Sequence, residues 1–277
     1  MSDAAILSGV TFVYLLSFLF YLVRMVGRRE FWGGAASLTA RIGFLLHTVA
    51  LLVRWKHSYD LGIGHVPLAN LYESLSFFAW AVLLMYLLLE WRTKNRSLGG
   101  FAIPIAFLLL AYASIAPGVT DRIQPLVPAL QSNWLTVHVL TCFLGYASFA
   151  MAFALGIMSL FLRPDEAAGE RGFFRLIPPA DKIDELLYQS VVLGFVLLSL
   201  GIMTGSVWAH YAWGSYWSWD PKETWSLITW IVYALMLHIR SVRGWRGRRM
   251  AVLSLIGFAS VLFTYLGVNL LDSLHSY

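Results

Sequence analysis

The sequence predicts an all-α integral membrane protein with about eight transmembrane helices and both termini on the periplasmic, or outer, side. The first observation is composition: 59% of the 277 residues are hydrophobic and 13% are charged, against roughly 45–50% and about 25% in soluble globular proteins. The second is the recurrence of apolar runs of about 20 residues, the length of a membrane-crossing helix. The third is the alternation of basic residues between successive connections.

Eight apolar runs are predicted to be spans. The first lacks a basic leader and a small-residue cleavage site, so we expect it to be retained and not removed as a signal peptide. The seventh begins at Asp220-Pro221-Lys222-Glu223, a capping-box pattern with proline at the first helical position. No Ser/Gly-rich linker or fixed-period repeat separates the runs, so residues 1–277 are predicted to form a single polytopic domain. The expected spans are approximately 5–26, 38–55, 71–91, 101–116, 134–162, 186–208, 223–241 and 250–270.

The basic residues test this count. With the N-terminus outside, sixteen of the twenty Lys and Arg fall at the inner ends of the eight spans, as the positive-inside rule requires. The other four, Arg54, Lys56, Arg122 and Lys222, fall outside. The net charge of +5 is therefore a signal of topology. No nucleic-acid partner is predicted, because no recognition motif accompanies the charge.

Residues 208–225 hold five of the twelve tryptophans and lie between the sixth and seventh spans, at the predicted outer face. Tryptophans that anchor helix ends at the membrane surface would account for two or three of them. We therefore predict an aromatic platform for a large, flat, partly apolar ligand, namely haem. Asp220 and Glu223 have a structural alternative to haem binding: as a capping box, they would only hold the start of the next helix.

Histidines are the most common axial ligands of haem iron. His138 lies four residues past Trp134, about 6 Å along its helix, and His275 follows the last span, so both are predicted to reach the platform level. His238 lies about 22 Å deeper in the seventh span, so we expect it to bind a second haem or haem at an earlier stage of crossing. Each has an alternative to iron binding. His275 would be an unconstrained residue of the C-terminal tail, and His238 would be a helix-end residue whose ring bonds to the backbone. His47 is a candidate partner of His238 or a packing residue.

The single cysteine, Cys142, lies in an apolar run and is predicted to be a small packing residue. The chain contains no Cys-x-x-Cys-His, so it is not expected to carry covalently attached haem. No nucleophile or general acid stands out, and no catalytic residue is predicted.

Two motifs carry a family resemblance. The tryptophan-rich stretch resembles the WWD signature of haem-handling proteins in cytochrome c maturation, and the eight-span plan and the length resemble the CcsA (ResC) subunit of the System II cytochrome c synthase. The stretches that carry it are Trp213-Gly-x-x-Trp217-x-Trp219-Asp220-Pro221-Lys222-Glu223-x-Trp225, led by Trp208-Ala209, and Pro67-Leu68-x-Asn70-x-Tyr72-Glu73-Ser74.

The resemblance implies a haem lyase subunit that works with a ResB (CcsB)-type membrane partner. It implies that haem b, held non-covalently, is bound outside between His138 and His275, and that His238 pairs in the membrane with a ligand from the partner. The substrate would be an apocytochrome c with Cys-x-x-Cys-His, and thiol-reducing proteins are further candidate partners. We expect a bacterial inner membrane in preference to a thylakoid membrane. The implied haem-binding residues are His138, His275, His238, Trp208, Trp213, Trp217, Trp219, Asp220 and Trp225.

Two other functions stay open. One is a haem exporter or chaperone, similar to CcmC, that does not itself catalyse attachment. The other is an unrelated transporter, which predicts helices broken near the membrane centre. No clear pair of such breaks is present, since prolines and glycines fall mainly at span ends.

Overall fold

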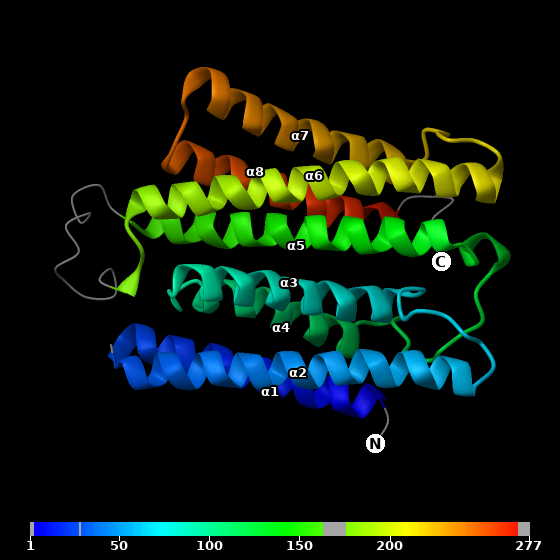
Figure 1. Ribbon diagram of the computed structural model, residues 1–277, viewed down its shortest axis with the longest axis horizontal. Helices are drawn as coiled ribbons and strands as arrows, with labels where there is room; N and C mark the ends of the chain where they lie inside the picture. Colours follow the sequence, from blue (N-terminus) through cyan, green and yellow to red (C-terminus); the bar gives the residue numbers. More distant parts are fainter. Residues whose placement is uncertain (1–2, 28, 163–175, 271–277) are drawn as a thin grey trace. The chain divides into compact units, whose positions relative to one another are not determined.

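The computed structural model describes residues 3–27, 29–162 and 176–270, and this part of the chain is helical with no strand (Figure 1). The all-α prediction is confirmed. Among the described residues, seven helices are long and apolar enough to cross a membrane, and α4, with 17 residues, is a shorter apolar helix. The helices are α1 Asp3–Gly27, α2 Glu30–Asp60, α3 Leu71–Thr93, α4 Gly99–Ile115, α5 Asn133–Phe161, α6 Ala180–Trp213, α7 Pro221–Arg243 and α8 Arg248–Tyr265, with 3-10 turns η1 Pro128–Leu130 and η4 Gly267–Leu270.

Helix ends differ most from the expected spans in α2 and α6. The helix α2 begins at Glu30 where the sequence predicts a span from 38, and α6 extends to Trp213 where the predicted span ends at 208. Apolar runs mark only the bilayer-crossing part, whereas backbone hydrogen bonding continues into the polar surface layer. At about 1.5 Å per residue the 31 residues of α2 exceed the ~30 Å hydrocarbon core.

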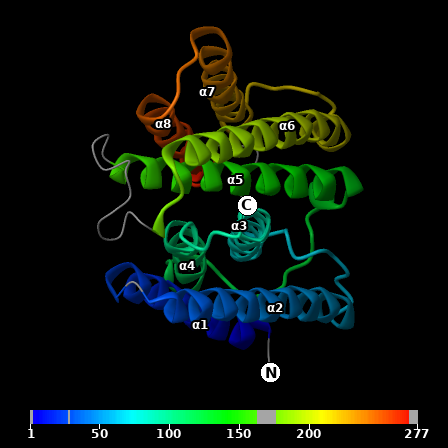
Figure 2. The same ribbon diagram turned by 60° about the vertical axis from the view of Figure 1, so that its left-hand side comes forward.

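The helices group into two compact units. The first, residues 1–126 and 162–179, contains α1 to α4, and the second, residues 127–161 and 180–277, contains α5 to α8. Figures 1 and 2 both show α1 beside α2 in the first unit and α5 beside α6 in the second. The single domain over 1–277 stays a prediction.

The first unit is held at one end by a buried charge cluster. Arg54 in α2 is 1% exposed; its Nη1 lies 2.6 Å from Asp3 Oδ2 and its Nε 2.8 Å from Glu73 Oε1. The second oxygen of Glu73 accepts the Ala69 N–H at 2.8 Å, while Asn70 Oδ1 caps α3 by accepting the Glu73 N–H at 2.9 Å. The cluster joins the starts of α1 and α3 to the end of α2, so much of the 67–74 motif has a structural role.

A second buried carboxylate joins the helices near the other end of this unit. Glu90 in α3 accepts hydrogen bonds from Ser37 Oγ at 2.5 Å and Arg41 Nη2 at 2.7 Å. The Tyr86 hydroxyl donates to Glu90 and also bonds the hydroxyl of Tyr21 in α1. A buried charge is tolerated when it is paired and hydrogen-bonded in this way.

The second unit is built on a close approach of α5 and α6. A Cβ added at Gly201 would lie 2.5 Å from the Sγ of Cys142, and one added at Gly205 would lie 2.5 Å from Nδ1 of His138. Small residues let membrane helices approach in this manner. Cys142 is a buried free cysteine, and its predicted packing role is confirmed. Further along the same face of α5, Phe149 meets α6 at Gly194, where an added Cβ would lie 2.5 Å from its ring, and it stacks on Tyr233 of α7 with 3.5 Å between ring centroids.

Candidate functional site

The tryptophan-rich segment 208–225 covers the end of α6, a short loop and the start of α7. Helix α6 ends at Trp213, and the next residue, Gly214, has a φ of +76° and donates its N–H to His210 O at 2.9 Å. A left-handed residue after a helix is favourable for glycine because it has no Cβ. Ser215 Oγ then donates to Trp217 O at 2.8 Å. These bonds fix the loop that leads into α7.

The predicted capping box at the start of α7 is confirmed. Asp220 Oδ1 accepts the Lys222 N–H at 2.9 Å, and Glu223 Oε2 accepts the N–H groups of Asp220 at 3.3 Å and Ser218 at 2.7 Å. Asp220 is buried. Both carboxylates therefore hold the helix start and the loop before it. A direct role of Asp220 in haem binding stays a prediction.

Trp219 has an unusual backbone. Its φ is +61°, and within the described part of the chain only Lys94 shares a positive φ among non-glycine residues. This conformation costs energy in residues with a Cβ and often occurs at functional sites. The Trp219 carbonyl accepts a hydrogen bond from Thr224 Oγ1 at 3.2 Å, and its side chain is 68% exposed. The loop thus presents an indole outward.

The five tryptophans of the segment do not form one flat surface. Trp208 is 2% exposed, and its Nε1 donates to Ala129 O at 2.8 Å. Trp213 meets Trp208 at 62° with 4.8 Å between centroids, and Trp217 meets Trp219 at 88° and 5.7 Å. Trp225 packs on Phe263 of α8 at 4.1 Å. Of the five, Trp208 is buried and Trp219 is exposed, while Trp213, Trp217 and Trp225 are partly exposed.

His138 of α5 is brought directly to this segment. Its ring stacks on Trp208, with 6.0 Å between centroids and 21° between planes. Its Nδ1 lies 2.7 Å from Gly201 O of α6. A carbonyl oxygen only accepts hydrogen bonds, so Nδ1 carries the proton and the ring lone pair is on Nε2. Metal-binding histidines are commonly oriented by such a bond from the other ring nitrogen.

The other predicted iron ligands are placed differently. His275 lies outside the described residues. His238 is an exposed residue of α7, and within the described part of the chain its ring has no hydrogen bond, which disfavours the backbone-bonded alternative. His47 is fully buried in the first unit, with Nδ1 at 3.0 Å from the Tyr14 hydroxyl. This placement favours its role as a packing residue over its role as a partner of His238.

Residues that orient His138 were missed in the sequence. They are Gly201, which supplies the carbonyl, and Gly205, which leaves room for the ring. Cys142, which the sequence predicts as a packing residue, packs against the same ring with its Sγ 3.7 Å from Nδ1. Gly201 and Gly205 are four residues apart on α6. This small-xxx-small spacing, typical of close helix contacts in membranes, is the signal that identifies them.

Comparison with known proteins identifies the family. The cytochrome c assembly protein family matches residues 68–275. A relative named cytochrome c biogenesis protein CcsA, from Synechococcus sp. (strain CC9902), is 40% identical over 268 residues, which cover 88% of this chain and 86% of the relative. The chain belongs to the CcsA family of cytochrome c biogenesis proteins. CcsA of Chlamydomonas reinhardtii is 44% identical over 238 residues, 84% of this chain but 65% of that longer relative.

A solved structure shares the fold. The chain named cytochrome c haem lyase CcmF superposes with a TM-score of 0.70 over 96% of this chain, at 18% sequence identity. This CcsA-family chain spans 47% of that protein. At this identity the likeness extends to the fold, so the helical architecture is shared between the two proteins.

Proposed function

We propose that this CcsA-family chain is the haem-holding subunit of a cytochrome c synthase, which binds haem b at the outer membrane face and promotes its attachment to an apocytochrome c. The observation that carries the proposal is His138. Its tautomer is fixed by Gly201 O, and its ring stacks on Trp208 of the WWD segment. The Nε2 lone pair that this leaves is suited to haem iron.

The proposed topology has eight spans with both termini outside. Counting α4 as the eighth is supported by its apolar composition and by the inner position that this gives to sixteen of the twenty basic residues. At about 1.5 Å per residue its 17 residues extend about 25 Å, slightly less than the hydrocarbon core. The membrane is proposed to be a bacterial inner membrane in preference to a thylakoid membrane.

In the proposed outer site, His138 and His275 are the axial ligands, and Trp213, Trp217 and Trp219 contact the macrocycle. Trp208 stacks on the His138 ring, while Asp220 and Trp225 fix the loop and α7. The buried Nε1 of Trp217 has no hydrogen-bond partner within the described residues. An unpaired buried donor costs free energy, and a haem carboxylate is a fitting acceptor.

His238 is proposed as the intramembrane ligand, completed by a ResB (CcsB)-type partner. It shares one exposed face of α7 with Ile231, Leu235 and Val242. An ionisable side chain among apolar residues is expensive against lipid and usually has a partner. A partner helix that covers this face and supplies a second imidazole removes that cost.

The chemistry is proposed to come from the substrates. The two thiols of the apocytochrome Cys-x-x-Cys-His add across the two haem vinyl groups, so that each sulfur bonds one vinyl carbon and the thiol proton goes to the other. The chain contributes orientation and exclusion of competing reactions. Proteins that keep the apocytochrome thiols reduced are proposed as further partners.

Co-expression tests the proposal. We expect cells that lack their own maturation system to make covalent cytochrome c when they receive this chain, its partner and an apocytochrome. Haem staining after denaturing electrophoresis measures attachment, and an apocytochrome with both cysteines replaced by serine is the control. External haem without thioether bonds would instead indicate the exporter or chaperone function.

A substitution at Gly205 tests the orientation of His138. We expect Gly205→Ala to weaken haem binding about 10- to 100-fold, the usual effect of losing a partner that orients a ligand. The added Cβ would lie 2.5 Å from Nδ1 of the ring and would push it from Gly201 O. Haem titration of the purified protein is the measurement. Gly9→Ala is the matched control, because nothing lies within 4 Å of its Cβ position; equal affinities in both variants would contradict the assignment.

A further inference from the structure

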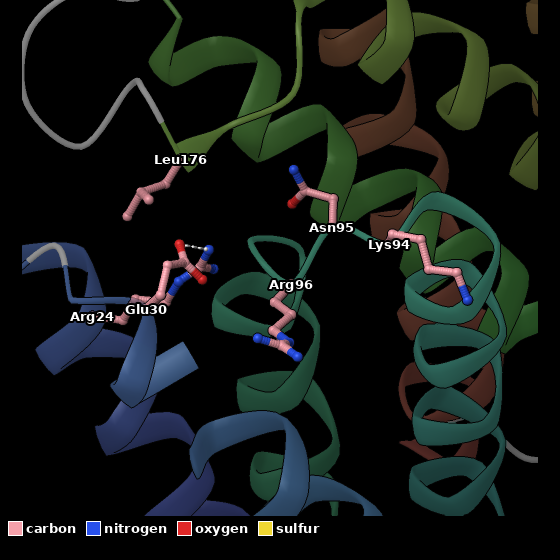
Figure 3. A pocket seen from close by; sticks show the side chains of 6 residues that line it. All are labelled: Arg24, Glu30, Lys94, Asn95, Arg96 and Leu176. Atoms are coloured by element: carbon pink, nitrogen blue, oxygen red, sulfur yellow. Dashed lines mark hydrogen bonds and ion pairs between the residues drawn. The ribbon is translucent and has the colours of Figure 1, made fainter. Parts of the chain in front are cut away.

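A polar cavity lies at the end of the first unit where α1 ends, α2 begins and α3 turns into α4. Its volume is about 260 Å³ (Figure 3). This is the end of α1 opposite to Asp3 and the Arg54 cluster. The residues that line the cavity are Arg24, Glu30, Lys94, Asn95, Arg96 and Leu176. None of them belongs to the proposed haem site.

Arg24 is the buried residue in the lining of this cavity and is 6% exposed. Its Nη2 pairs with Glu30 Oε1 at 3.0 Å and its Nη1 lies 3.5 Å from Ser97 Oγ, but its buried Nε has no hydrogen-bond partner among the described residues. A Cβ at Gly33 would lie 2.6 Å from that Nε. Glycine at this position of α2 is therefore needed to admit the guanidinium.

Arg96 is held beside it by the α3–α4 turn. Lys94 ends α3 with a φ of +55° and donates its N–H to Glu90 O at 2.8 Å, and Asn95 Oδ1 accepts the Ser97 N–H at 2.8 Å. The Arg96 carbonyl accepts the Gly99 N–H at 3.1 Å, but its guanidinium has no ion pair or hydrogen bond to the described residues. Figure 3 shows it facing the same hollow as the Arg24–Glu30 pair, whereas Lys94 points away from them.

The charges in the cavity do not balance. Two guanidinium groups face one carboxylate, and that carboxylate, Glu30, is mostly exposed. A buried charge without full compensation is costly, so an anion between Arg24 and Arg96 would be stabilising. The planar guanidinium donates two parallel hydrogen bonds to phosphate oxygens, which makes phosphate a well-matched ligand.

The position of the cavity at the helix ends indicates where the phosphate comes from. The same helix ends expose the apolar side chains of Val26, Phe31 and Trp91 beside the charged residues. A mixture of exposed apolar, aromatic and basic side chains at helix ends is typical of the headgroup layer of a membrane. Basic pockets between transmembrane helices bind acidic lipid headgroups. We infer that this cavity binds the phosphate of an anionic phospholipid headgroup, with Arg24 and Arg96 as its donors.

Lipid binding to the purified full chain tests the inference. Vesicles of phosphatidylcholine mixed with phosphatidylglycerol are solubilised with the protein, and native mass spectrometry measures the lipid that stays bound. We expect enrichment of phosphatidylglycerol, and a loss of about fivefold in Arg96→Gln, the usual effect of one basic residue at an anionic surface. Arg92→Gln is the matched control, because Arg92 is an exposed cation at the same end of α3 that does not line the cavity.

A second variant separates the effect of cavity volume from the effect of charge. Gly34→Leu fills the region next to Arg96, where a Cβ would lie 4.0 Å from Nη1, and leaves every charge in place. We expect it to lose the lipid as Arg96→Gln does, with the melting temperature of each variant as the check on folding. Equal lipid retention in all variants overturns the inference. Binding of inorganic phosphate without enrichment of phosphatidylglycerol, or loss of haem in Arg96→Gln with the lipid retained, overturns the lipid as the ligand.

Discussion

Replacing Arg54 by methionine should lower the free energy of unfolding by about 3–5 kcal/mol, the effect of breaking a buried ion pair by removing one partner. Arg54 is 1% exposed and pairs with two buried carboxylates, Asp3 at 2.6 Å and Glu73 at 2.8 Å. Methionine preserves much of the volume but leaves both carboxylates without their cation. Denaturant unfolding in mixed micelles, followed by tryptophan fluorescence, measures the change.

An exposed ion pair is the control for this prediction. Lys182 lies 2.8 Å from Glu185, and both side chains are about half exposed. Lys182→Met should change the free energy of unfolding by less than about 1 kcal/mol, because solvent screens such pairs. Replacing Asp3, Arg54 and Glu73 together by apolar residues should restore part of the loss, since no buried charge then remains. Equal effects of Arg54→Met and Lys182→Met would contradict the role of the cluster.

Features that depend on local sequence could be predicted well. The all-α fold follows from composition and from the length of the apolar runs. The capping box at Asp220 and Glu223 was also predictable, because both residues interact within one helical turn. The burial of Arg54 was not. The charge count assigns Arg54 to the outer side together with Lys56, but only the packing of α1, α2 and α3 brings two carboxylates to it.

Features that depend on helix packing could be predicted only in part. Nearness in sequence favoured a single aromatic shelf, but Trp208 lies on the buried side of α6 and Trp219 projects from a loop, so their rings point in different directions. His138 was singled out from its depth alone. Its partner Gly201 is 63 residues away. The spacing of Gly201 and Gly205 marks a face of α6 suited to a close helix contact, but it does not specify which residue of α5 packs there.

His138→Gly should remove most of the haem from the purified protein. The iron loses an axial imidazole, so the loss of affinity should exceed the ~100-fold upper limit for losing an orienting partner. Glycine leaves a space beside Trp208, and imidazole supplied in the medium should enter it and restore binding. The visible spectrum of the purified protein measures both effects, since it reports the axial ligands of the iron.

The rescue by imidazole is what distinguishes a ligand from a structural residue. A general folding defect in His138→Gly would also lower the haem content, but free imidazole would not repair it. His210→Gly is the matched control: His210 belongs to the same segment, is exposed and stacks on Tyr216 with 4.2 Å between centroids and 3° between planes. It should keep its haem with or without imidazole. An unchanged spectrum in His138→Gly would show that the iron takes its ligands elsewhere, and His138 would then serve only to pack α5 against Trp208.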